Sequence, residues 1–355
     1  MRRSERLAGR PGPAGALAPR AGALAALGLL LLVTALAPGC LTTESEGTDA
    51  DTINLYGFSV KGEVMDGRII PMFKTYWKNQ TGKDVHFSTV YAGSGTVTNQ
   101  VIAGAEGEVM VLSTEWDAMQ LQRKGLVTTN WTAFPHNGTV TRSPWVIMSR
   151  PGNPKGLSDF PDLTKGGIEL VHPDPLTSGG AMWSIFAIYG SELKKTTASE
   201  GAPNTTQAEK VLGGVVKNVI TWQASARNAL SQFDLGYGDA LIDYECEALF
   251  MRQEGRTYDI SYPESTILSE HKVVIVDKNV GAKERDLVQA FVDFLWTPEA
   301  QRAFAECGFR SVDDAINAAH PEFGPVPMPF TIDYLGGWAE AKADIIDGIY
   351  AKMRE

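Results

Sequence analysis

The sequence is poor in the side chains that most often bind metal ions. Its 355 residues include 3 cysteines and 5 histidines, and none of these has the HxxxH or CxxC spacing that brings two ligands together. We therefore expect no metal site and no cofactor. The histidines are interpreted as surface or packing residues: His86, His136, His172, His271 and His320.

Cysteine pairs are equally scarce. Cys246 and Cys307 are the two cysteines that follow residue 40, and in an oxidising compartment outside the cytoplasm such residues can form a disulfide. Their spacing does not show whether they approach each other. The sequence leaves their bonding state open.

The sequence also has fewer positively charged than negatively charged side chains. The chain has 32 Lys and Arg against 42 Asp and Glu, a formal net charge of −10. Residues 1–39 contain five arginines and Glu5, a net charge of +4, so their removal leaves −14. A strongly acidic chain is a poor partner for nucleic acid, and we expect no nucleic-acid binding.

The amino terminus has the pattern of an export signal. Arginines precede an apolar run at residues 23–37, which is too short for a comfortable membrane span. Cys40 follows as in a bacterial lipobox, although Ala37-Pro38 matches the usual pattern imperfectly, so cleavage and release is the alternative to lipidation. We expect residues 1–39 to be a signal peptide and residues 40–52 a lipoprotein tether, which places the chain in the periplasm or on the cell surface.

The rest of the chain alternates short apolar strands with amphipathic helices, which predicts an α/β protein with mixed, mostly parallel sheets and flanking helices. Residues 298–306 are predicted to be a helix, with Thr297 as its cap and Pro298 in its first turn. Two strands, residues 144–149 and 271–277, are predicted to cross between two lobes as a hinge. The predicted divisions are residues 53–145 (first part of lobe 1), 146–270 (lobe 2) and 271–355 (hinge return and second part of lobe 1).

Three stretches place hydroxyls or glycines where a strand gives way to a helix. They are Gly93-Ser94-Gly95, Ser178-Gly179-Gly180 and Ala224-Ser225-Ala226. Free N–H groups at a helix start carry partial positive charge and attract anions, and glycine lets the backbone approach a ligand closely. Each stretch alone is equally well explained as a helix cap. Three converging starts can hold an oxyanion without a metal.

In their order and spacing, these stretches resemble the periplasmic sulfate- and thiosulfate-binding proteins of ABC importers, which have a type II periplasmic-binding-protein fold. The resemblance covers nearly all of the exported chain and includes Ala226-Arg227, residues 273–278 and residues 330–338. It implies a monomeric receptor, not an enzyme, that captures sulfate or thiosulfate and passes it to a membrane permease.

The resemblance also implies a site made of hydrogen-bond donors, chiefly the amides of residues 94–96, 178–181 and 226 with the hydroxyls of Ser94 and Ser178. Such a site discriminates against hydrogen phosphate, whose proton needs an acceptor. The predicted ligand-binding residues are Ser59, Lys61, Ser94, Gly95, Ser178, Gly179, Gly180, Ala181, Ala226 and Tyr244.

Three positions depart from the pattern of this family. Tyr244 aligns with a tryptophan whose indole N–H donates to the anion, Lys61 aligns with an aspartate, and Met182 aligns with an arginine. These differences bear on which anion is bound, not on its negative charge. Asp243 would favour phosphate if it reached the ligand, and Lys61 would be a solvated loop residue if it did not face the cleft.

The alternatives are a receptor for phosphate or molybdate, and a ligand-sensing subunit not coupled to transport. Gly93-Ser94-Gly95 also resembles a hydrolase nucleophile turn, but no histidine has an assigned partner. A carboxylate-rich run is interpreted as a capping or solvated face: Asp239, Asp243, Glu245 and Glu247. Three tryptophans are interpreted as core, with exposure of Trp183 favouring a carbohydrate site instead: Trp116, Trp183 and Trp222.

Overall fold

The computed structural model describes residues 51–354. The predicted signal peptide, most of the tether and the lipidation site at Cys40 lie outside the described residues. Within residues 51–354, every helix is too short or too polar to cross a bilayer.

The first group of strands is parallel. Strands β1 (Asp51–Phe58), β2 (Val85–Ala92) and β3 (Val109–Leu112) are paired in the order β2-β1-β3. Alternate side chains of β3 enter two different hydrophobic clusters, Val109 and Val111 on one face and Met110 and Leu112 on the other. Both faces of this group are therefore covered, as a parallel arrangement requires. Helices α2 (Ile70–Thr81) and α9 (Arg285–Phe294) share one cluster, and α3 (Ser94–Ile102) and α4 (Glu115–Arg123) the other.

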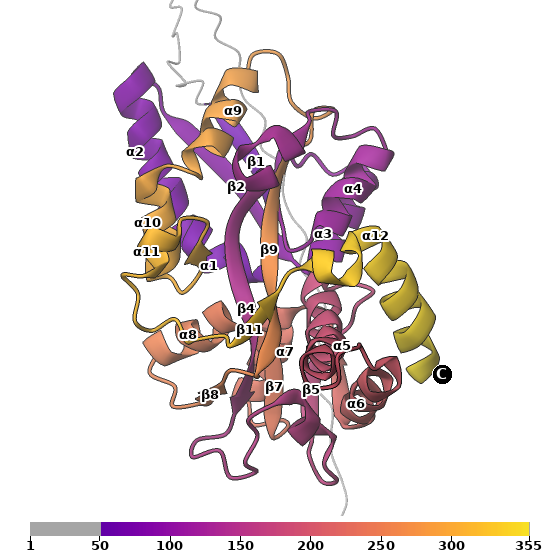
Figure 1. The fold of residues 1–355 in the computed structure, drawn as a ribbon. Coiled ribbons are helices and arrows are strands. Elements are labelled where there is room, and N and C mark those ends of the chain that lie inside the picture. Colours follow the sequence, from indigo (N-terminus) through magenta and orange to yellow (C-terminus); the bar gives the residue numbers. More distant parts are fainter. Residues whose placement is uncertain (1–50, 355) are drawn as a thin grey trace, which may run out of the picture. The chain divides into compact units, whose positions relative to one another are not determined.

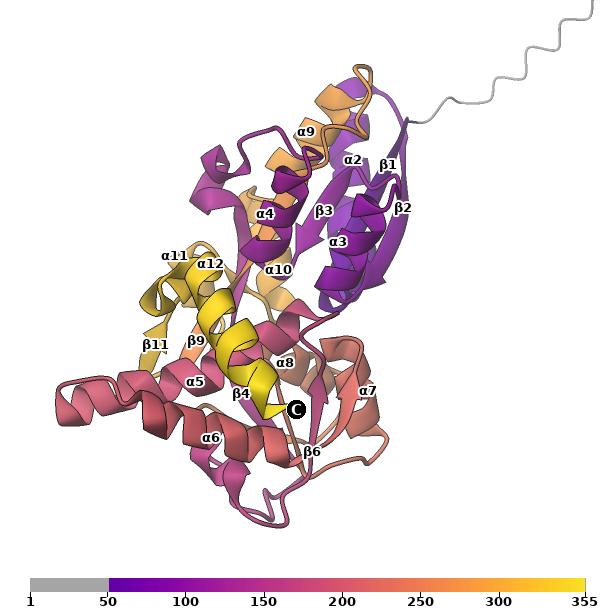
Figure 2. The same cartoon turned by 90° about the vertical axis from the view of Figure 1, so that its right-hand side faces the viewer.

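The second group is mixed. Strand β5 (Leu170–Pro173) is parallel to β6 (Val219–Gln223) and to β7 (Ala240–Tyr244), and β7 is antiparallel to β4 (Thr139–Ser149). Helices α7 (Ala226–Asp234) and α8 (Glu245–Gln253) pack on one face, while α5 (Gly179–Glu200) and α6 (Thr205–Lys217) lie on the other. Figure 2 shows α5 and α6 side by side beneath the carboxyl-terminal helical segment.

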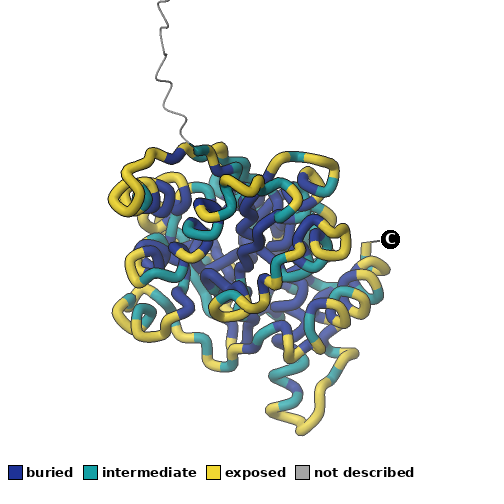
Figure 3. The backbone as a smooth tube through the Cα atoms, turned by 90° about the horizontal axis from the view of Figure 1, so that it is seen from above, coloured by how far each residue is buried: buried dark blue, intermediate teal, exposed yellow. Residues whose placement is uncertain are grey.

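Two long strands join the groups. β4 and β9 (Ser265–Ile275) are 11 residues each, pair with each other, and contribute to both groups, which gives the order β2-β1-β3-β9-β4-β7-β5-β6. Figure 1 shows both strands running through the middle of the fold. They contain most of the two segments that the sequence predicts to cross between lobes. Figure 3 shows the buried residues concentrated in the interior of the fold and the exposed residues along its outer loops and helices.

The remaining elements are short, and α10 begins as predicted, with the Thr297 hydroxyl accepting from the Ala300 amide. The helices are α1 (Gly62–Val64), α10 (Pro298–Glu306), α11 (Asp314–Asn317), α12 (Gly337–Ala341) and α13 (Ala351–Met353). The strands are β8 (Asp259–Ser261), β10 (Arg310–Ser311) and β11 (Met328–Phe330). Single turns and π-helical stretches are η1 (Ser59–Lys61), η2 (Met65–Ile69), η3 (Trp131–Ala133), η4 (Pro135–Gly138), η5 (Phe160–Thr164), η6 (Ile332–Leu335) and η7 (Lys342–Tyr350).

Candidate functional site

The starts of α3, α5 and α7 meet at one place. The amide of Thr96, in the first turn of α3, donates to the carbonyl oxygen of Thr177 at 3.3 Å. The Thr177 hydroxyl in turn donates to the carbonyl oxygen of Ala224, just before α7, at 2.9 Å. Because each loop contacts the next, the structure brings Ser94, Ser178 and Ala226 into one neighbourhood, although they are far apart in sequence.

The two glycines that begin α5 are in close contact with neighbouring elements. A Cβ on Gly180 would lie 3.2 Å from the Cβ of Ala226 and 3.3 Å from Cε2 of Tyr244. A Cβ on Gly179 would lie 2.6 Å from Cγ2 of Thr114, which is tighter than real side chains tolerate. The first turn of α5 therefore packs directly on α7, on the end of β7 and on the cap of α4.

The helix caps use some of the donors that the sequence assigns to a ligand. The hydroxyl of Ser178 accepts from the Ala181 amide at 3.4 Å, and the same amide donates to the Ser178 carbonyl at 3.1 Å. The amide of Ser178 donates to the Asp174 carbonyl at 2.9 Å, so the amides of Thr96, Ser178 and Ala181 are occupied within the chain. Amides at a helix start have no acceptor inside the helix, so those of Ser94, Gly95, Gly179, Gly180 and Ala226 remain the donors that the fold presents.

The hydroxyl of Ser94 is hydrogen-bonded to the carboxylate of Asp117, a residue that the sequence analysis does not include in the site. The hydroxyl donates to Oδ2 of Asp117 at 2.6 Å and accepts from the Ser113 amide at 3.0 Å. Thr114, the cap of α4, donates to the same carboxylate oxygen at 2.7 Å. Asp117 is buried, and this burial raises the pKa of its carboxyl group. The sequence does contain a pattern that indicates this carboxylate. A predicted strand is followed by Ser113-Thr114, and an acidic residue lies three positions after Thr114, as in a helix capping motif.

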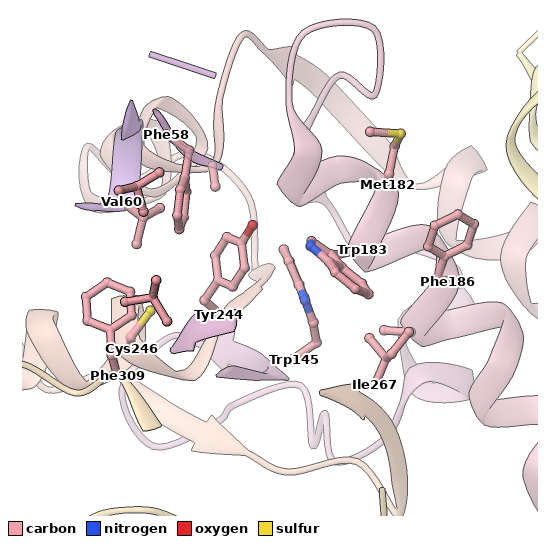
Figure 4. Close-up of a cluster of buried hydrophobic side chains, with 14 of the residues drawn as sticks. Phe58, Val60, Trp145, Met182, Trp183, Phe186, Tyr244, Cys246, Ile267 and Phe309 are labelled. Carbon is pink, nitrogen blue, oxygen red and sulfur yellow. The ribbon is translucent and has the colours of Figure 1, made fainter. Parts of the chain in front are cut away.

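Tyr244 lies at the end of β7, in a cluster of buried aromatic rings. Its phenol oxygen is 2.7 Å from Oγ of Ser113, and its ring lies between those of Phe58 and Trp145 (Figure 4). Burial raises the pKa of Tyr244 well above its usual range, so the phenol keeps its proton. The phenol group is therefore a neutral hydrogen-bonding group beside the first turn of α5.

Ser59 and Lys61 belong to the turn η1, which packs against α7, but the side chain of Lys61 has other partners. The ammonium group of Lys61 is fully buried, donates to Oγ1 of Thr141 at 2.5 Å, and stands 3.5 Å from the centre of the Phe309 ring. Burial lowers the pKa of Lys61 well below its usual range. The lysine is neither a solvated loop residue nor aimed at the helix starts. Ser59 begins the turn η1, where its carbonyl accepts from Gly62.

The carboxylate-rich run has structural partners. Asp243 is buried and accepts from the Tyr244 amide at 2.8 Å, beside the ion pair between Arg227 and Glu247. Glu245 accepts from Arg310 at 2.7 Å. Residues 51–354 contain no group of three His, Cys, Asp or Glu side chains that could hold a metal ion.

Trp183 is buried and not a platform for a sugar. It is 1% exposed, and its indole N–H donates to the Ser113 carbonyl at 2.8 Å. A cavity of about 420 Å³ adjoins the helix starts and includes Gly95, Asp117, Met182 and Trp116 in its wall. Met182 lines this cavity without a charge, and the cations in the cavity wall are Lys342 and Arg354, which are paired with Asp347 and Asp174.

Comparisons with known proteins agree on one family. The sequence profile described as "Bacterial extracellular solute-binding protein" matches residues 67–310. A sulfate-binding protein of Synechococcus elongatus is 34% identical over 329 residues, which cover 90% of this chain and 91% of the relative. A thiosulfate-binding protein of Pseudomonas aeruginosa is 31% identical, covering 78% and 84%. The solved structure of the sulfate-binding protein SubI from Mycobacterium tuberculosis H37Rv is similar with a TM-score of 0.75 and 29% identity, covering 83% of this chain and 99% of SubI.

Proposed function

We propose that this chain, which belongs to the sulfate- and thiosulfate-binding family of bacterial extracellular solute-binding proteins, captures sulfate or thiosulfate outside the cytoplasm for an ABC importer. The family consists of binding proteins, not enzymes. The observation that carries the proposal is the meeting of three helix starts, whose amides are uncharged donors with partial positive charge.

The number of donors is sufficient for useful affinity. A hydrogen bond to a charged group contributes about 1.5–3 kcal/mol, and five to seven such bonds reach micromolar affinity, about −8 kcal/mol, after the costs of association. In our proposal the amides of Ser94, Gly179, Gly180 and Ala226 bind the anion, with the phenol of Tyr244 in place of an indole. Amides need no formal charge, so neither Lys61 nor an arginine at position 182 is required.

We further propose that the protein closes on its ligand as two lobes. Residues 53–145 with 271–355 form one lobe and residues 146–270 the other, with β4 and β9 as the hinge. The start of α3 then belongs to one lobe and those of α5 and α7 to the other. Closure brings them together around the ligand. We also propose that Cys40 is lipidated and anchors the chain to a membrane.

The alternative ligand is another tetrahedral oxyanion, phosphate or molybdate. Asp243 is the residue that would favour phosphate, but its Oδ1 accepts from the Tyr244 amide and its surroundings are Arg227 and Glu247. Oδ2 of Asp243 is buried without a hydrogen-bond partner among residues 51–354, and its access to the ligand decides between sulfate and phosphate. A sensing subunit would use the same site and would differ only in its membrane partner.

Isothermal titration calorimetry of the exported chain with sulfate, thiosulfate, molybdate and phosphate tests the proposal. We expect micromolar or tighter binding of sulfate or thiosulfate, and at least tenfold weaker binding of phosphate. Tighter binding of phosphate would support the alternative. Failure to bind any of the four anions would contradict both.

A further inference from the structure

We propose that Arg354 is a positioning residue for the anion site, acting through Asp174 on the loop of residues 174–178 that leads into α5. The inference rests on the proposed function, because this loop determines where the first amides of α5 lie. Arg354 is 180 positions from Asp174 in sequence. It belongs to the carboxyl-terminal helical segment, residues 337–354, which Figure 2 shows beside α5 and α6.

The loop of residues 174–178 is organised by Asp174. The Asp174 carbonyl accepts from the amides of Thr177 and Ser178 at 3.1 and 2.9 Å. Oδ1 of its side chain accepts from the Leu176 amide at 2.9 Å. Three amides of one short loop therefore converge on a single residue, and the direction in which the chain enters α5 depends on where Asp174 lies.

The same loop joins the three helix starts. The Thr177 carbonyl accepts from the Thr96 amide in α3, and the Thr177 hydroxyl donates to the Ala224 carbonyl before α7. A displacement of this loop therefore changes the distances between the starts of α3, α5 and α7. Because donors that are already in place cost less to bring to a ligand, such a displacement weakens anion binding without removing any donor.

Arg354 holds the side-chain oxygen of Asp174 that the loop leaves over. Its Nη1 donates to Oδ2 of Asp174 at 2.8 Å. Its guanidinium group stands 4.1 Å from the centre of the Trp222 ring, on β6. The residue after Trp222, Gln223, accepts from the Asp174 amide at 2.7 Å through its carbonyl. Arg354 is thus placed against the end of β6, and Asp174 is fixed through both its main chain and its side chain.

A cation beside an anion site could instead act by direct attraction. The two roles of Arg354 differ in what they predict for Asp174→Asn. If attraction mattered, loss of the acidic charge next to Arg354 would tighten the binding of a dianion. If position matters, the same substitution weakens binding, because Arg354 loses its ion-pair partner. Asparagine retains Oδ1 for the Leu176 amide, so the variant removes the ion pair and leaves the turn its other bonds.

The test is the Kd for sulfate, measured by calorimetry for the wild type, Arg354→Gln, Asp174→Asn and the double variant. We expect each single substitution to raise the Kd at least fivefold. The double variant is expected to bind within twofold of the weaker single variant, because both substitutions break one link. Lys352→Gln is the matched control, since it removes the same charge from an exposed lysine of α13, and we expect its Kd to lie within twofold of wild type.

Urea unfolding without sulfate separates positioning from a general loss of stability. We expect the single variants to unfold at the same urea concentration as the wild type, because a partly exposed ion pair contributes little to global stability. A lowered midpoint together with weaker binding would assign the effect to the fold and overturn the inference.

Four other results would overturn it. They are a rise in Kd of less than fivefold in either single variant, tighter binding by Asp174→Asn, multiplied effects in the double variant, and a Lys352→Gln variant that binds as weakly as Arg354→Gln. In each of these cases the wild type still binds sulfate and the proposed function stands. Absence of sulfate binding by the wild type would contradict the proposed function, and this inference with it.

Discussion

Gly93 and Thr177 are in direct backbone contact, so close that a Cβ on Gly93 would overlap the carbonyl oxygen of Thr177. The same Cβ would lie 2.7 Å from the carbonyl oxygen of Ala224. The loop before α3 therefore fits against the loops before α5 and α7 only because residue 93 has no side chain.

Gly93→Ala is predicted to weaken sulfate binding at least a hundredfold. The added methyl group meets two backbone carbonyls, which cannot move like the end of a flexible side chain, so the helix starts are held apart. Gly166→Ala is the control, since a Cβ there has no atom within 4 Å. Calorimetry with sulfate measures the effect, and a Kd for Gly93→Ala within threefold of wild type would contradict it.

Tyr244→Phe is predicted to raise the Kd for sulfate about tenfold, or about 1.4 kcal/mol, because the variant lacks the phenol donor. Tyr262→Phe is the matched control, since its hydroxyl donates to Glu245 at 2.7 Å and not to residues of the helix starts. An unchanged Kd in Tyr244→Phe would show that the phenol only packs against Ser113.

Lys61→Met is predicted to stabilise the fold by about 1–4 kcal/mol, since an apolar side chain replaces a buried ammonium whose acceptor is a hydroxyl. Thr141 keeps a partner, because its Oγ1 is also 2.8 Å from Nδ1 of His271. The control is Lys78→Met, an exposed lysine paired with Asp84. Urea unfolding at neutral pH measures the difference, and a variant less stable than wild type would contradict the prediction.

The same substitution is predicted to change how stability depends on pH. The folded-state pKa of Lys61 is lowered below 10.5, so the unfolded chain binds more protons between the two values. Wild-type stability therefore rises with pH across that window, up to 10.5. In Lys61→Met this contribution is absent, and the increase is smaller.

His172 is predicted to make the fold sensitive to acid. Its Nδ1 lies 2.7 Å from the Pro173 carbonyl, which only accepts, so Nδ1 carries the proton and Nε2 accepts from Ser184 at 2.8 Å. Burial lowers the pKa of His172 from 6.5 to about 4, so the unfolded state takes up a proton first as the pH falls below 6.5. Stability is lost between pH 6.5 and pH 4, by about 3 kcal/mol.

Urea unfolding at pH 7 and pH 4 of the wild type and His172→Asn checks this contribution. The variant is expected to be less stable at pH 7, because it loses the bond to Ser184, but to lose about 3 kcal/mol less than wild type on acidification. An equal loss in both proteins would contradict the prediction.

Local features of the sequence predict more of the fold than of the site. Thr297 and Ser178 act as helix caps as expected, because a cap depends on residues within one turn. The apolar runs at residues 144–149 and 271–277 predict parts of the two long strands, β4 and β9. The sequence does not predict that these strands pair with each other and join the two strand groups.

The environment of Lys61 was not predictable, because it depends on residues distant in sequence. Phe304 and Phe309, which follow Lys61 by more than two hundred positions, place their rings 4.6 Å and 3.5 Å from its ammonium group. Cys246 and Cys307 are a similar case. They are unbonded but line the same small cavity as Phe309, which their spacing could not indicate.

Ser94 shows why donors cannot be assigned from a motif alone. Gly-Ser-Gly at a helix start predicts a hydroxyl facing a ligand, but that hydroxyl is bonded to Asp117, 23 positions later. A hydroxyl has one proton, so its nearest acceptor decides its role.

The central claim is that amides from three helix starts surround a tetrahedral anion. A crystal structure of the exported chain with selenate, located by the anomalous scattering of selenium, tests this most directly. We expect one selenium peak between the starts of α3, α5 and α7, with the selenate oxygens within hydrogen-bonding distance of the amides of Ser94, Gly180 and Ala226. A fully occupied selenate bound elsewhere, with these three amides not in contact with it, would contradict the account.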